Sequence, residues 1–140
     1  PNLRIIGKAS LVGHEGNVRI AKTYGLVVRS SFMVGLPFDT NEIIEQSFTK
    51  ATQLGIDEFA VYPLIPYPGT AIEKFPQNFG YTLIHKDFVD YVQMGRDGKT
   101  CFALKHKYFG AEDVERWLKI ATQILKSGGV RHMSESAVAG

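Results

Sequence analysis

The stretch SFMVGLPFDT, residues 31–40, reads as the end of a strand, a turn and the start of a helix. Residues 26–34 are mostly apolar, aromatic or β-branched, which is typical of a strand covered on both faces. Gly35 allows a positive φ or a close approach to the backbone, and Pro37 prevents the strand from continuing. Asp39 and Glu42 have the spacing of a capping box that opens a helix. Ligands of parallel α/β proteins bind at such strand-to-helix junctions, so we expect a ligand site at Gly35.

The segments on either side of this turn repeat the same pattern. Residues 40–54 have apolar side chains at helical spacing, and Gly55 ends that helix before a second apolar strand over residues 58–62. Upstream, residues 17–24 read as a helix that ends at Gly25. Strand, helix and strand with short links form a βαβ unit, which requires parallel strands and a right-handed crossover. The sequence therefore predicts an α/β fold, a section of parallel barrel or sheet.

The rest of the chain is less regular until its last helix. Glycines and a proline divide residues 70–110 into short pieces, with a helix expected at 86–94 and an extended run at 101–104. Residues 111–126 have a clear apolar stripe and precede Gly128 and Gly129, which predicts a helix docked on the sheet. We expect three parts: a partial barrel over residues 1–110, a C-terminal helix over 111–128, and a flexible tail over 129–140.

Composition excludes several classes of protein. The chain has 140 residues, 44% of them hydrophobic, which suits a single domain with a core. A formal charge of +2 with scattered basic residues gives no basis for nucleic-acid binding. No apolar run has the length of a membrane span, and the single cysteine, Cys101, fits a reducing compartment, so we expect a cytoplasmic protein without a membrane partner. Because the chain starts at Pro1, we also expect it to be a piece of a longer protein.

Two motifs resemble one enzyme family. The run FMVGLPFDT, residues 32–40, preceded by AKTYGL, residues 21–26, resembles the second half of the radical SAM barrel. The run PLIPYPGT, residues 63–70, is similar to the segment that follows the next strand, especially in members related to the cobalamin-binding branch. The resemblance covers roughly residues 16–80 and implies a TIM-like (β/α) barrel whose second half lies in this chain. It also implies S-adenosylmethionine and a 4Fe–4S cluster as cofactors of the full-length enzyme, with cobalamin as a further candidate.

The chain departs from this family in its cysteines. The family holds its cluster on three cysteines in a C-x3-C-x2-C run, whereas this sequence has one cysteine, far downstream of the motifs. We therefore expect the C-terminal part of such an enzyme, which ligates no metal and is inactive alone.

The resemblance also assigns candidate residues to the adenine end of S-adenosylmethionine. Met33 stands at the apolar position that packs on adenine, and Ser31 stands where the family often has the first glycine of its strand motif. The second strand end is expected to offer backbone amide and carbonyl groups to the adenine edge. The expected cofactor-binding residues are Ser31, Met33, Gly35, Leu36, Pro37, Tyr62, Pro63, Leu64 and Ile65. No catalytic residue is assigned, and the substrate of the parent enzyme is expected to be a small molecule.

Several alternatives stay open at this stage. Arg29 is either paired with an acid of the scaffold, which we favour, or it receives a substrate carboxylate or phosphate. The histidines lack metal-ligand spacing and are expected to be surface or capping residues: His14, His85, His106 and His132. Two alternatives to the radical SAM interpretation also stay open for the chain as a whole. It is a non-catalytic α/β module that binds a partner, or it belongs to a different parallel-barrel enzyme whose turn at Gly35 binds phosphate. An open sheet edge predicts either self-association or a C-terminal segment folded across it.

Overall fold

The computed structural model describes residues 14–84 and 102–136. Its centre is a parallel sheet of three strands in the order β1-β2-β5, formed by β1 (Arg29–Val34), β2 (Glu58–Pro63) and the short β5 (Arg131–His132). β1 and β2 pair over their whole length, from Arg29 beside Glu58 to Val34 beside Pro63. The helix α3 (Asn41–Thr52) joins them, which confirms the predicted βαβ unit. The described residues form no closed barrel, so the barrel remains an expectation.

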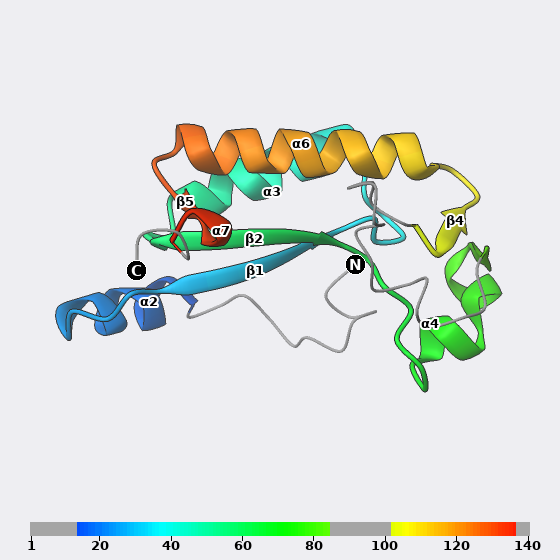
Figure 1. Cartoon of the computed structure of the whole chain (residues 1–140), viewed down its shortest axis with the longest axis horizontal. Coiled ribbons are helices and arrows are strands. Elements are labelled where there is room, and N and C mark those ends of the chain that lie inside the picture. The colour runs from blue at the N-terminus through cyan, green and yellow to red at the C-terminus, as the bar shows by residue number, and fades with distance from the viewer. Residues whose placement is uncertain (1–13, 85–101, 137–140) are drawn as a thin grey trace.

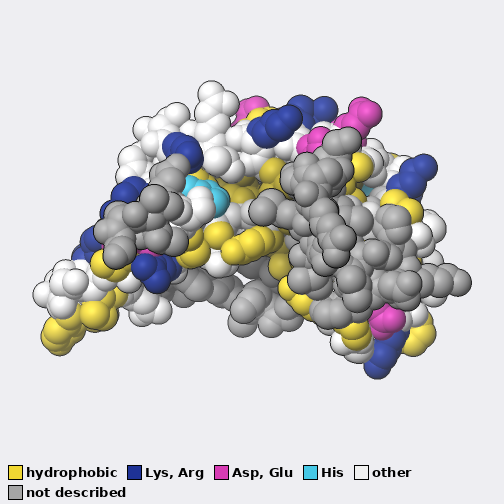
Figure 2. All heavy atoms as spheres, in the orientation of Figure 1, with side chains coloured by type: hydrophobic (Ala, Val, Ile, Leu, Met, Phe, Trp, Pro, Cys, Tyr) yellow, Lys and Arg dark blue, Asp and Glu magenta, His cyan; other side chains and the backbone are white. Residues whose placement is uncertain are grey.

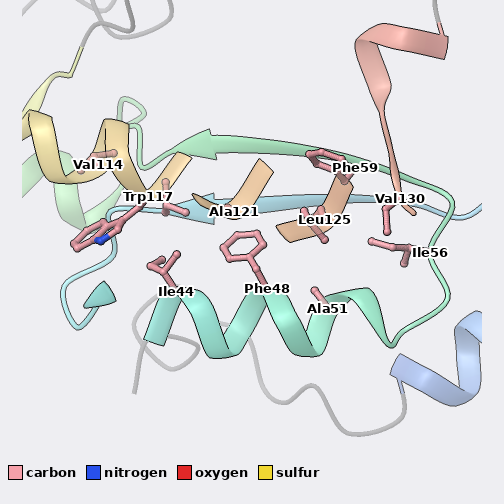
Figure 3. Packing of buried hydrophobic residues seen from close by; sticks show 11 residues of the cluster. Ile44, Phe48, Ala51, Ile56, Phe59, Val114, Trp117, Ala121, Leu125 and Val130 are labelled. Atoms are coloured by element: carbon pink, nitrogen blue, oxygen red, sulfur yellow. The ribbon is translucent and has the colours of Figure 1, made fainter. Parts of the chain in front are cut away.

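Two helices cover one face of this sheet. The last long helix, α6 (Ala111–Ser127), lies beside α3 on the same side of the strands (Figure 1). Side chains from both helices and from the face of the strands that the helices cover meet there (Figure 3). This core consists of Val34, Ile44, Phe48, Ala51, Ile56, Phe59, Val114, Trp117, Ala121, Leu125 and Val130. The indole nitrogen of Trp117 also donates a hydrogen bond of 2.7 Å to the Asn41 side-chain oxygen, which ties the start of α3 to α6.

On the opposite face of β1, which we call the open face, the described side chains are exposed, which differs from the prediction of a strand covered on both faces. Side chains alternate along the strand, so that Phe32 and Val34 point toward the helices while Ser31 and Met33 are exposed. The strand also begins at Arg29, three residues later than predicted, because Leu26 and Val27 are largely exposed.

Smaller elements gather beyond the carboxyl ends of the strands (Figure 1). They are α4 (Ala71–Lys74), the 3-10 helix η1 (Pro76–Phe79), and β3 (Tyr81–Leu83) paired antiparallel with β4 (Leu104–His106). The predicted extended run at residues 101–104 thus lies mostly downstream, in β4. The helix expected at 86–94 lies outside the described residues, as do Cys101 and the first thirteen residues.

At the amino ends of the strands, α2 (His14–Thr23) precedes Gly25, whose φ of 71° confirms the predicted helix terminator. Residues 129–140 are expected to be a flexible tail, and the described part of this segment contains two short elements. Residues 131–132 form β5, which pairs with Glu58 and Phe59 of β2, and α7 (Met133–Ser136) follows. A C-terminal segment therefore covers part of the outer edge of β2.

Candidate functional site

The turn after β1 is held by a buried carboxylate. Gly35 has a φ of 85°, and Asp39, which is 8% exposed, accepts hydrogen bonds of 2.9 Å from the backbone amides of Gly35 and Leu36. The predicted capping role of Asp39 is wrong, because the N-cap of α3 is Thr40, whose hydroxyl accepts from the Ile43 amide at 3.3 Å. Asp39 stabilises the turn rather than the helix, since the turn amides are within its reach.

Tyr81 fixes this turn from the other side. Its hydroxyl donates a hydrogen bond of 2.6 Å to the carbonyl oxygen of Gly35, and the side chain is buried. Burial raises the pKa of Tyr81, and the negative charge of Asp39 raises it further. The hydroxyl therefore remains protonated and acts as a donor, so that β3 is anchored to the end of β1.

These contacts weaken the alternative of a phosphate-binding turn. A phosphate at Gly35 would need the free amides that now donate to Asp39, and it would meet the charge of that carboxylate. The reason for a glycine is also local. A Cβ on Gly35 would lie 3.4 Å from Val114 of α6, on the helix side of the sheet and away from the open face. This is an ordinary van der Waals distance, so the positive φ is what favours glycine here, and no ligand approach is needed to explain it.

The open face places two candidate residues side by side. Met33 is paired with Tyr62 across β1 and β2, and Ser31 is paired with Ala60. Met33 is 42% exposed and Tyr62 is 51% exposed, which is unusual for apolar side chains on neighbouring parallel strands. Hydrophobic side chains are visible at the surface in the middle of the view in Figure 2. The geometry brings Ser31, Met33 and Tyr62 together at the carboxyl end of the sheet.

The end of β2 offers fewer backbone groups than the sequence predicts. The Leu64 amide donates to the Val34 carbonyl at 2.8 Å, and the Ile65 carbonyl accepts from the Tyr67 amide at 3.0 Å. Pro63 has no amide hydrogen. The Leu64 amide and the Pro63 nitrogen therefore cannot donate to an adenine edge, whereas the Ile65 carbonyl keeps one acceptor lone pair. Two candidates remain, both in the turn after β1. Leu36 is buried and Pro37 is half-buried.

Arg29 belongs to the scaffold. Its Nε donates to the Glu58 carboxylate at 2.5 Å, and Arg131 of β5 contacts the same carboxylate at 3.3 Å. Glu58 is 3% exposed, so the two guanidinium groups neutralise a buried charge. This confirms the favoured interpretation of Arg29 and places it at the amino end of the sheet, away from Met33.

The described residues contain no group of three potential metal ligands. His106 is buried at 4% exposure, so its prediction as a surface or capping residue is wrong. Its ring stacks on Phe109 at a centroid distance of 4.3 Å, and burial lowers the pKa of His106. The Nδ1 atom accepts from the Tyr108 amide at 3.4 Å, as a neutral imidazole can.

No helix in residues 14–84 or 102–136 is long and apolar enough to cross a bilayer.

A cleft of about 550 Å³, which the sequence does not predict, lies beyond the end of β1. It is lined by the turn after β1, by η1 and by the loop after β4. Its aromatic residues, Phe38, Phe79, Tyr108 and Phe109, come from three separate segments of the chain. Lys107 and Tyr108 of this lining are exposed and lie just before α6, but no motif in the sequence marks them.

Comparison with known proteins gives one partial similarity. A segment of 58 residues, 41% of the chain, is 36% identical to a protein of Pyrococcus horikoshii described as an uncharacterized methyltransferase. That segment corresponds to only 13% of the length of the other protein. No family model matches the chain, and no solved structure matches it.

Proposed function

We propose that this chain forms one side of an S-adenosylmethionine site in an enzyme of the radical SAM type, with the adenine ring against Met33 and Tyr62. The observation that carries this function is the pairing of these two exposed apolar side chains on the helix-free face. They lie at the carboxyl ends of adjacent parallel strands, where α/β folds bind ligands.

The exposed pair fits a flat apolar ring. A thioether and a phenol ring side by side offer a polarizable surface of the kind on which nucleobases stack. Ser31 lies two residues before Met33 on the same face, and its hydroxyl is exposed. We assign to Ser31 a hydrogen bond to the ribose. When bound, S-adenosylmethionine supplies a sulfonium-activated group, which fits the partial similarity to a methyltransferase.

The residues of this chain do not fit a 4Fe–4S cluster. The sequence contains one cysteine, and the described residues contain no cluster of potential metal ligands. We therefore propose that the amino-acid end of S-adenosylmethionine and the chemical step depend on residues outside this chain. We assign no residue here to cobalamin.

The proposal is tested by ligand binding to the 140-residue chain. We expect S-adenosylmethionine and 5′-deoxyadenosine to bind with similar affinity, at about 1 mM, because only the adenosyl part has partners here. Calorimetry at high ligand concentration, or ligand-observed NMR, measures both affinities. Binding of S-adenosylmethionine that is far tighter than binding of 5′-deoxyadenosine would show that this chain also holds the amino-acid end, which contradicts the assignment.

Two variants locate the binding. Tyr62→Ala and Met33→Ala should each weaken 5′-deoxyadenosine binding about fivefold, since each removes a partly exposed surface that the adenine would cover. Ile43→Ala is the matched control, because Ile43 is 39% exposed but lies on α3, on the other side of the sheet. Unchanged affinity in both strand variants, with the fold intact, would place the adenine elsewhere.

A further inference from the structure

The cleft beyond β1 is separate from the open face that carries Met33 and Tyr62. Its walls are the turn from Pro37 to Thr40, the segment from Gln77 to Gly80, and the segment from His106 to Phe109. None of these segments includes a residue that we assign to adenine contact. At about 550 Å³ the cleft falls in the size range of sites for small molecules.

Aromatic side chains give the cleft two exposed ring faces. Phe38 is 50% exposed and Tyr108 is 79% exposed, although each lies beside buried or half-buried neighbours. Tyr108 extends an aromatic cluster in which its ring lies 5.6 Å from His106, which in turn stacks on Phe109. The interior of this cluster is therefore packed, and the ring of Tyr108 at its outer end is largely exposed to the cleft.

Three polar side chains of the cleft make no hydrogen bond or ion pair with the described residues: Gln77, Asn78 and Lys107. The Lys107 ammonium lies 4.7 Å from the centre of the Tyr108 ring, so a cation and an aromatic face are presented together.

The other charges near the cleft do not cancel this cation. The Asp39 carboxylate is directed at the two turn amides, which satisfy it. His106 has a lowered pKa because it is buried, and it is neutral at pH 7. Glu42 follows in the first turn of α3, where the helix backbone and Thr40 lower its pKa, so it compensates the helix end rather than Lys107.

From this arrangement we propose that the cleft binds a small molecule with a planar aromatic or heteroaromatic ring and an anionic group. The ring lies against Phe38 and Tyr108, the anion pairs with Lys107, and the amides of Gln77 and Asn78 bind the polar edge of the ring. Nucleotides and aromatic carboxylates share this chemistry. This site is independent of the adenine site proposed above.

The test uses the 140-residue chain and four defined probes followed by NMR. Adenosine 5′-monophosphate and indole-3-acetate carry both a ring and an anion, and they represent the two sources of ligand. Adenosine lacks the anion, and ribose 5-phosphate lacks the ring. We expect at least one of the two complete probes to shift the ring resonances of Phe38 and Tyr108, and to bind more tightly than either partial probe.

Variants separate the contributions of charge and ring. Lys107→Met should weaken the complete probe about fivefold and leave adenosine unchanged, and Lys107→Arg should restore the affinity. Lys105→Met is the matched control, since Lys105 is exposed on β4 and does not line the cleft. Tyr108→Ala should weaken both the complete probe and adenosine, whereas Tyr24→Ala, at a highly exposed position directly after α2 and outside the cleft, should change neither.

The outcomes are distinguishable from those of the proposed function. If adenosine 5′-monophosphate shifts only the resonances of Met33 and Tyr62, the cleft is not its site. If indole-3-acetate also shifts no resonance of the cleft, the proposal is overturned. If neither complete probe shifts Phe38 or Tyr108 at millimolar concentration, it is overturned as well. Equal losses of affinity in Lys107→Met and Lys105→Met would show that the probe is attracted only by the general positive charge of the surface. That result would contradict a specific site at Lys107.

Discussion

Asp39 is the residue whose replacement tests the structure of the turn most sharply. Its carboxylate accepts two amide hydrogen bonds of 2.9 Å and is 8% exposed. A hydrogen bond to a charged group contributes about 1.5–3 kcal/mol, so two of them set an upper range of about 3–6 kcal/mol. Water that enters from the adjoining cleft can partly satisfy the amides in Asp39→Ala. We therefore expect a loss of about 3 kcal/mol in the free energy of unfolding.

The control is the next residue in the chain. Thr40→Ala removes the N-cap of α3 and should cost about 1 kcal/mol. Urea unfolding followed by circular dichroism measures both variants, and Asp39→Asn, which keeps an acceptor oxygen without the charge, should fall between them. A loss for Asp39→Ala no larger than that for Thr40→Ala would refute the assignment of Asp39 to the turn.

Three further predictions follow from buried groups and from the cysteine content. Tyr81→Phe should lower the free energy of unfolding by about 1–2 kcal/mol because the Gly35 carbonyl loses its donor, whereas Tyr62→Phe, on the open face, should have no effect. His106 has a lowered pKa in the folded state, so the unfolded chain binds its proton first as the pH falls. Stability measured by urea unfolding should therefore decrease from pH 7 toward about pH 5, and His106→Gln should flatten that dependence. Anaerobic incubation with iron and sulfide should give no stoichiometric cluster on this chain, and an absorbance and iron count of one cluster per chain would contradict this expectation.

The parts of the fold that the sequence predicts are those set by local patterns. Residues 40–54 and 111–126 have apolar side chains at helical spacing, and helices form there over Asn41–Thr52 and Ala111–Ser127. The glycine at position 35 adopts the positive φ that its place after a strand indicates. These features depend on neighbours within a few positions along the chain, so one sequence is enough to predict them.

The parts that the sequence does not predict depend on distant contacts. Asp39 and Glu42 have capping-box spacing, yet Asp39 turns back to Gly35 because the turn brings two amides closer to it. His106 is buried only because β4 pairs with β3, whose Tyr81 precedes it by 25 positions in the sequence and lies 4.7 Å from its ring. The cleft likewise joins three segments, and no local spacing indicates that they meet.

The central claim is that the adenine of S-adenosylmethionine lies on the open face against Met33 and Tyr62. Intermolecular nuclear Overhauser effects between 5′-deoxyadenosine and the isotope-labelled chain measure this contact directly. We predict cross-peaks from the adenine H2 and H8 protons to the Met33 methyl group and to the Tyr62 ring, since both side chains are exposed and paired. Cross-peaks from a bound adenine to other residues, with none to Met33 or Tyr62, would contradict the claim.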